Sequence, residues 1–174
     1  FPLLGIALVI IFIRNFVAQK RLSQSIPFVL YSIGKRKGFI KTVHTYGHLI
    51  ASSITVGLGG SVGLEGPSVV TGSAIGSNIS QLFHLNHKRK ILLLGCGAAA
   101  AISALFNSPI SGVIFVLEII LVDLKITFLI PLMFSSVSAF IVAWAISDQN
   151  KLFGDVFIEK FTAGDVPFYV LLGL

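Results

Sequence analysis

Residues 49–80 read LIASSITVGLGGSVGLEGPSVVTGSAIGSNIS, and this stretch decides the fold. Glu65 is its only charged residue, so the stretch exceeds the roughly 20 apolar residues that a helix needs to cross a bilayer core. Glycine leaves helical geometry easily and proline cannot continue a helix from the preceding turn, so one straight helix is disfavoured. The interrupting residues are Gly57, Gly59, Gly60, Gly63, Gly66 and Pro67. We predict two helices joined by a break inside membrane-depth sequence.

Composition extends this interpretation to the whole chain of 174 residues. Hydrophobic residues make up 55% and charged residues 11%, with a mean hydropathy of +0.93, which is too apolar for an ordinary soluble domain. Intrinsic disorder is excluded by the same numbers, and a disulfide scaffold is excluded because Cys96 has no partner. Another apolar stretch, 126–147, is long enough to cross once, and 2–13 fits a clipped spanning helix. We predict an all-α integral membrane protein.

The net charge of +6 is interpreted as a topology signal, because the basic residues cluster between apolar stretches that must be buried. No nucleic-acid partner is expected. Cytoplasmic loops accumulate Lys and Arg, which predicts that loops 14–41 and 88–90 are cytoplasmic. Loop 148–166 is rich in acids and is predicted on the opposite side. Segments 42–87 and 91–122 must then each begin and end at the cytoplasmic face, as helical hairpins or re-entrant pairs.

Three prolines stand where helices could begin inside apolar sequence, namely Pro27, Pro67 and Pro109. Proline suits the first helical turn because its missing N–H has no partner there, and Ser108 is a good N-cap candidate. The alternative is a kink in a continuous helix, which membranes tolerate. An interrupted helix presents free N–H groups and the positive end of its dipole, which together form an anion site without a cationic side chain. Transport proteins use this arrangement near the bilayer midplane.

Glu65 is the most informative single residue. A carboxylate at membrane depth is costly, so it should be paired, protonated or facing a wet cavity, and no Lys or Arg lies near it in sequence. Just ahead of the helix that starts around Pro67, its ionised form would occupy the place of an anion, which predicts a gate. A purely structural cap on that helix is the alternative. Glu118, near the cytoplasmic end of its apolar stretch, fits a structural bond or snorkelling as well as proton handling.

Other patterns carry less information. Gly59 with Gly63, and Gly72 with Gly76, allow helix backbones to approach closely. Residues 95–100 match the dinucleotide fingerprint G-x-G-x-x-A, but the soluble βαβ context that it requires is missing. His44 and His48 form an i, i+4 pair without a clear third metal ligand, so interfacial histidines are expected instead. We predict no enzymatic activity, no cofactor and no metal site.

Taken together, the motifs resemble those of the CLC family of chloride channels and chloride/proton antiporters. Residues 63–67, GLEGP, are similar to that family's G-R/K-E-G-P motif. Residues 106–118, FNSPISGVIFVLE, are similar to its F-N-A-P-L-A-G-I-L-F-x-x-E run. With the intervening segment 95–101 the likeness covers most of 50–125, and 23–27, SQSIP, stands more weakly where the family has G-S-G-I-P.

The resemblance implies a bundle of tilted and broken helices in two inverted-topology halves. Residues 1–174 would form the first half of that transmembrane domain. The family's G-x-F-x-P motif and its pathway tyrosine belong to the second half and do not occur in this sequence. The likeness also implies a homodimer in the lipid bilayer, with one anion pathway per subunit and an interface formed by helices 109–121 and 126–147.

The same likeness assigns site residues. Glu65 would be the gating glutamate, Gly66 a backbone donor at the outer anion site beside Leu64, and Glu118 a possible proton-pathway residue. The central anion site would lie near Gln24, Ser25 and Ile26.

Three departures from the family pattern bear on function. Leu64 replaces the basic residue before the gate, and Gln24 replaces the central-site serine, although Ser25 follows it. Ile119 stands where antiporters usually carry a second acid, and an apolar side chain cannot relay a proton. Passive conduction of chloride or another small anion such as nitrate is therefore favoured. A proton-coupled chloride or fluoride antiporter is the alternative, and a non-transporting membrane scaffold is the alternative of another class.

Overall fold

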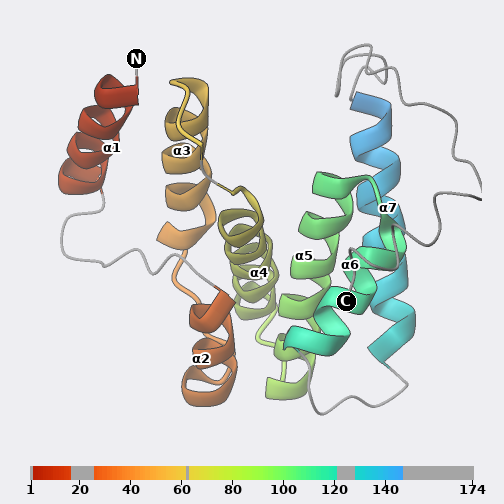
Figure 1. The fold of residues 1–174 in the computed structure, drawn as a ribbon. Coiled ribbons are helices and arrows are strands. Elements are labelled where there is room, and N and C mark those ends of the chain that lie inside the picture. Colours follow the sequence, from red (N-terminus) through yellow and green to blue (C-terminus); the bar gives the residue numbers. More distant parts are fainter. Residues whose placement is uncertain (1, 17–25, 62, 121–127, 147–174) are drawn as a thin grey trace, which may run out of the picture.

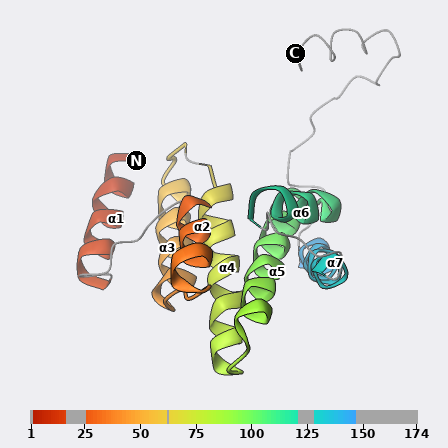
Figure 2. The same ribbon diagram turned by 90° about the horizontal axis from the view of Figure 1, so that it is seen from below.

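The computed structural model describes residues 2–16, 26–61, 63–120 and 128–146, and its regular structure there is entirely helical (Figure 1). The elements are α1 (Pro2–Phe16), α2 (Ile26–Arg36), α3 (Val43–Gly57), α4 (Glu65–Leu82), α5 (His87–Phe106), α6 (Pro109–Phe115), the π-helical turn η1 (Val116–Ile120) and α7 (Leu129–Ile146). Viewed from below, they extend in a row from α1 through α3, α4 and α5 to α7 (Figure 2). The predicted all-α fold is confirmed, and α5 and α7 are each long and apolar enough to cross a membrane.

The predicted break in the first apolar stretch is also present, because α3 ends at Gly57 and α4 begins at Glu65. The two helices pack against each other as a hairpin. A second hairpin follows, in which α5 turns at Asn107, a residue with a φ of 52°, into α6. The left-handed conformation at Asn107 ends α5 in the manner of a helix C-cap, and it leaves Pro109 as the first residue of α6.

The pair α4 and α5 forms the centre of the molecule, and glycines bring their backbones into contact. A Cβ atom at Gly72 would overlap the carbonyl oxygen of Gly97, and one at Gly97 would overlap that of Gly72. Gly76 is equally close to the carbonyl oxygen of Leu93. The expected packing role of Gly72 and Gly76 is therefore confirmed. The expectation for Gly59 and Gly63 is wrong, because both residues lie in the α3–α4 connection and not on a helix.

Helix α7 is attached to α5 and α6 by serine hydroxyls. Ser135 donates to the carbonyl oxygen of Cys96 at 2.8 Å, and Ser136 donates to that of Pro109 at 2.5 Å. From the other side, the Ser103 hydroxyl donates to the carbonyl oxygen of Ser136 at 2.7 Å. Hydrogen bonds of this kind supplement close packing where no hydrophobic force drives helices together. Apart from Ser138, the rest of α7 is apolar and largely exposed, with Phe134 at 75%.

The basic clusters differ from the predicted loops. Lys88, Arg89 and Lys90 lie in the first turn of α5, although cations are unfavourable at the positive end of a helix dipole. The segment 14–41 contains α2 and is only partly a loop, while 148–166 lies outside the described residues. In Figure 1 the end of α2 and the start of α5 share one side of the molecule. This common side agrees with a topological role for the basic residues, and the membrane side on which they lie stays a prediction.

Candidate functional site

The α3–α4 connection brings the chain back toward the start of α4 through a tight turn. Gly59 has a φ of 85°, a conformation that residues with a side chain rarely adopt. The Gly60 N–H donates to the carbonyl oxygen of Thr55 at 2.8 Å, and a Cβ at Gly60 would lie 2.7 Å from the same oxygen. These two glycines therefore allow α3 to end and the chain to turn within a few residues.

Glu65 lies in the first turn of α4, which begins two residues before Pro67. No side chain caps this helix at Leu64, and the backbone closes it with a bond from the Ser68 N–H to the Leu64 carbonyl oxygen at 3.0 Å. Free N–H groups and the positive dipole end therefore remain at its start. The structural cap by Glu65, which was the alternative to a gate, is not formed, and the internal helix start around Pro67 is confirmed.

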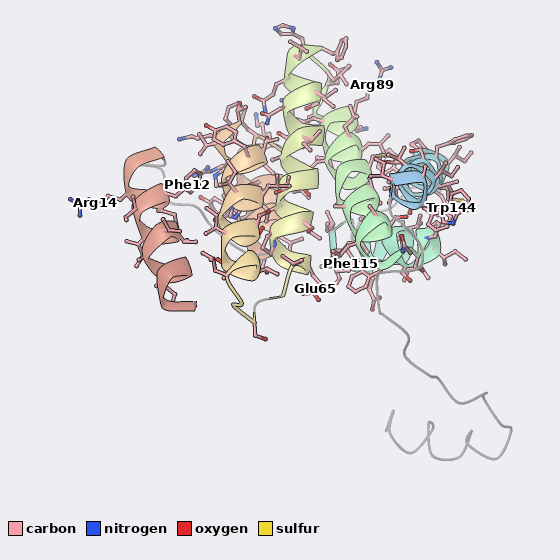
Figure 3. All side chains as sticks on the ribbon, turned by 90° about the horizontal axis from the view of Figure 1, so that it is seen from above. Phe12, Arg14, Glu65, Arg89, Phe115 and Trp144 are labelled. Carbon is pink, nitrogen blue, oxygen red and sulfur yellow. The ribbon has the colours of Figure 1, made fainter. Side chains whose placement is uncertain are left out.

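The carboxylate of Glu65 curls back over the glycine that precedes the helix. A Cβ atom at Gly63 would lie 2.5 Å from Glu65 Oε2, so the carboxylate occupies the space that a side chain there would need. Glu65 is exposed and has no hydrogen bond or ion pair with another residue that the structure describes. Figure 3 shows it at the opposite end of the α4–α5 pair from Arg89 of the basic run. The acid can therefore move without breaking a bond.

The second predicted anion position is at the start of α2. Gln24 and Ser25 lie outside the described residues, and Ile26, half-buried, begins the helix, with Pro27 in its first turn. The ring of Phe28, also in that turn, contacts His44 of α3 with 4.6 Å between ring centroids.

The histidine pair is not interfacial, and that expectation is wrong. Both His44 and His48 are buried, and His44 Nδ1 lies 3.2 Å from His48 Nε2. Helical spacing places them on one face of α3, but only tertiary packing, which includes the contact of Phe28 with His44, removes them from the surface. Among the described residues no group of three His, Cys, Asp or Glu side chains could hold a metal ion.

At the start of α6, Ser108 occupies the N-cap position in an extended conformation, as predicted. Its hydroxyl pairs with that of Ser111 at 2.8 Å and does not accept a backbone N–H. Glu118 is exposed and lies in η1, where the helix widens into a π turn. No sequence pattern predicted this turn, and π turns occur frequently at functional sites.

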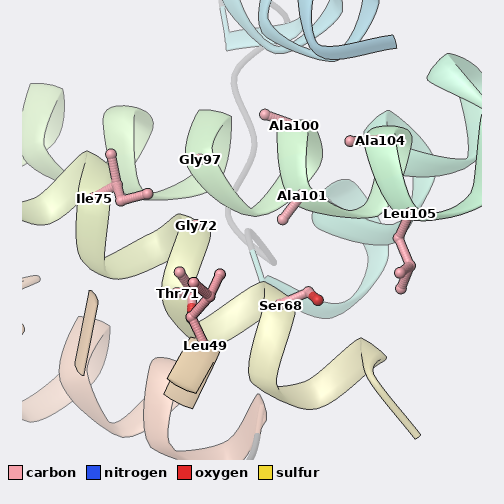
Figure 4. A pocket seen from close by; sticks show the side chains of 10 residues that line it. All are labelled: Leu49, Ser68, Thr71, Gly72, Ile75, Gly97, Ala100, Ala101, Ala104 and Leu105. Atoms are coloured by element: carbon pink, nitrogen blue, oxygen red, sulfur yellow. The ribbon is translucent and has the colours of Figure 1, made fainter. Parts of the chain in front are cut away.

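A groove of about 470 Å³ opens between α3, α4 and α5 (Figure 4). Ser68 and Thr71 supply its hydroxyl groups, and the remaining lining is apolar or glycine. The Thr71 hydroxyl oxygen is buried and has no hydrogen-bond partner among the described residues. The apolar lining makes this groove a poor place for an anion.

A row of buried serines on α4 was not predicted from the sequence, and one of them, Ser77, is a functional candidate. Ser73, Ser77 and Ser80 are fully buried on α4. Their spacing of four and then three residues places them on one helix face, which was a readable signal. Whether such a face meets solvent, lipid or protein is decided only by the neighbouring helices.

Comparison with known proteins identifies the family. Residues 5–174 match the family described as "Voltage gated chloride channel". The chain belongs to this family, known as CLC. It is 33% identical over 71% of its length to a putative chloride channel protein ClcB-like of Ralstonia nicotianae, and 28% identical over 78% to chloride channel protein CLC-f of Arabidopsis thaliana. It is 36% identical over 56% of its length to the H(+)/Cl(-) exchange transporter ClcA of Vibrio cholerae.

These matches cover only part of each CLC relative. The chain spans 30% of the ClcB-like protein, 18% of CLC-f and 21% of ClcA. No solved structure gave a match. The comparisons thus show that this is a CLC membrane protein fold built from helices, while the activity of the whole protein is a separate question.

Proposed function

We propose that the full-length protein containing these residues passively conducts small anions, with chloride as the expected ion, through a CLC-type pathway gated by Glu65. The observation that carries this proposal is the Glu65 carboxylate at the uncapped start of α4, free of any hydrogen bond to a described residue. An ionised carboxylate there competes with an anion for the same N–H groups and the same dipole. When the acid is protonated or swings aside, the anion can enter.

The remaining roles follow from the same electrostatics. Gly66, beside Leu64, donates a backbone N–H at the outer anion position, and Ile26 with Gln24 and Ser25 forms the central one. Helix dipoles attract an anion without a fixed full charge, which allows release as well as binding. Residues 1–174 form the first of two inverted-topology halves, and the basic segments 14–41 and 88–90 face the cytoplasm, opposite 148–166.

A proton-coupled antiporter is the second candidate. ClcA of Vibrio cholerae is named as an H(+)/Cl(-) exchange transporter, and Glu118 is exposed as a proton-handling residue would have to be. Ile119 argues against coupling because it cannot exchange a proton. A chloride gradient imposed on proteoliposomes separates the candidates, since an antiporter drives protons uphill and a passive channel does not.

The gate is tested by Glu65→Gln in the full-length gene product. The neutral amide cannot ionise, so we expect chloride efflux from liposomes to persist and its increase at acidic pH to disappear. Glu118→Gln neutralises an exposed acid elsewhere, and in a passive channel, where Glu118 handles no protons, it serves as the matched control and should leave the acid activation in place.

Two outcomes would contradict the proposal. If Glu65→Gln stays as pH-sensitive as the wild type, Glu65 is not the gate. If the wild-type protein releases no chloride from liposomes, the chain belongs to a non-transporting scaffold and its glycines serve packing alone.

A further inference from the structure

The connection between α2 and α3 is tied to the side of α4 by one buried serine. The Ser77 hydroxyl accepts the N–H of Ile40 at 3.0 Å and donates to the carbonyl oxygen of Gly38 at 2.6 Å. It also accepts from Gln81 Nε2 at 3.0 Å. A hydroxyl has one hydrogen to donate and two lone pairs, so these three bonds use its full capacity. Ser77 and Ile40 are both fully buried.

Neighbouring side chains of α4 strengthen the same tie. Gln81 Nε2 lies 3.3 Å from the carbonyl oxygen of Ile40, and Asn78 Nδ2 donates to the Thr45 hydroxyl at 2.8 Å. Residues 77, 78 and 81 lie on one face of the helix, so a single stripe of α4 holds the connection and the start of α3.

The backbone of the connection has little freedom to adopt another shape. Lys37 and Gly38 both have positive φ angles, 51° and 77°, which turn the chain sharply after α2. The Gly38 N–H donates to the carbonyl oxygen of Ser32 at 2.8 Å, and a Cβ at Gly38 would lie 3.2 Å from Lys90 Cγ on α5. The connection is therefore fixed directly to the end of α2.

This tie lies far from the starts of α2 and α4. Ser77 follows Glu65 by twelve residues, or about 18 Å along α4, and α2 is about 15 Å from Ile26 to Arg36. Both helices end toward the same side of the molecule (Figure 1). Because helices of this length are stiff, the tie near their ends fixes how their starts lie relative to each other.

We propose that Ser77 is a positioning residue that sets the spacing between the outer anion position at the start of α4 and the central one at the start of α2. The proposal rests on the proposed function, which places anions at those two starts. Loosening the tie should change how strongly anions are held and which anion is preferred. A purely structural role would lower stability and leave both properties unchanged.

The test is Ser77→Ala in the full-length gene product reconstituted into liposomes. Chloride efflux is measured over a series of chloride concentrations, and the nitrate-to-chloride flux ratio is measured at one concentration. We expect the half-saturating chloride concentration to shift roughly fivefold, which corresponds to about 1 kcal/mol, and the flux ratio to change.

Ser73→Ala and Ser80→Ala are the matched controls, because both serines are fully buried on the same helix. The Ser80 hydroxyl donates only to the carbonyl oxygen of Ser77 within α4, at 2.6 Å, and the Ser73 hydroxyl has no partner among the described residues. Both controls should keep the half-saturating concentration and the flux ratio of the wild type.

Gln81→Leu keeps the test decisive if Ser77→Ala does not fold. It removes both bonds of Gln81 Nε2 and leaves Ser77 in place. We therefore expect its half-saturating chloride concentration to shift in the same direction as that of Ser77→Ala, but by less. Wild-type half-saturation and flux ratio in every variant that folds would overturn the positioning role. A wild-type protein without chloride flux would instead refute the proposed function, and that measurement is made first.

Discussion

At the scale of single residues, Glu65, the proposed gate, lies against the glycine two positions before it. The Glu65 carboxylate occupies the space that a Cβ atom would need at Gly63, and no other described side chain holds it there by a hydrogen bond. The shape of the backbone and the dipole of α4 thus hold the Glu65 carboxylate in this position, and no cationic partner among the described residues does so. This arrangement agrees with Leu64, which stands where the CLC motif has a basic residue and brings no positive charge.

Gly63→Ala should therefore weaken the block without touching the acid. The new methyl group would displace the carboxylate, which is the flexible end of its side chain, and chloride efflux at neutral pH should rise toward that of Glu65→Gln. Efflux from liposomes at neutral and acidic pH measures this change. Gly57→Ala is the control, since a Cβ at Gly57 meets nothing within 4 Å. Unchanged efflux at neutral pH in Gly63→Ala would show that the carboxylate is seated elsewhere.

At the scale of secondary structure elements, α4 and α5 are held together by backbone-to-backbone contact. Gly72 and Gly97 face each other so closely that neither position has room for a methyl group. In a bilayer, where lipid tails are as apolar as leucine, such close contact supplies much of the attraction between helices. The contact also fixes the register of α4 against α5, and with it the position of Glu65 relative to α5.

Gly97→Ala should destabilise the protein by roughly 1–3 kcal/mol, the usual effect of overpacking, because backbone atoms cannot move aside as a side chain can. Thermal unfolding of the full-length gene product in detergent measures the loss. Gly34→Ala is the matched control inside α2, where a Cβ meets nothing within 4 Å, and it should stabilise the helix by about 0.5–1 kcal/mol. Equal thermal unfolding midpoints for Gly97→Ala and Gly34→Ala would contradict the close contact between α4 and α5.

At the scale of the whole molecule, the flank formed by α7 has a broad apolar surface. A shallow groove of about 280 Å³ on it is lined by Ile130, Met133, Phe134 and Val137. The predicted dimer interface, helices 109–121 and 126–147, includes this flank, apart from 121–127 and 147, which lie outside the described residues. The opposite flank is formed by α1 (Figure 2).

A dimer through this flank predicts a specific cross-link. With Cys96 replaced by alanine, Met133→Cys should give a disulfide-linked dimer of the full-length gene product when it is oxidised in membranes. Leu8→Cys is the control, because Leu8 is similarly exposed, at 49% against 50%, but lies on α1. Cross-linking of Leu8→Cys alone, observed on a reducing and non-reducing gel pair, would place the interface on the other flank.

The sequence by itself determined the helical class, the break between residues 57 and 65 and the helix starts near the three prolines. These features depend on local chemistry, namely apolar length, glycine freedom and the missing proline N–H, and all of that is readable residue by residue. The same holds for Gly72 and Gly76, whose spacing of four predicts one helix face.

Only the tertiary structure decided which faces meet. It buried His44 and His48, moved Gly59 and Gly63 from a packing role into a turn, and tied Ser77 to a connection 37 residues earlier in the sequence. Periodicity says which side chains share a face, but not what covers that face. That second fact depends on contacts between residues far apart in the chain, whose geometry no local pattern contains.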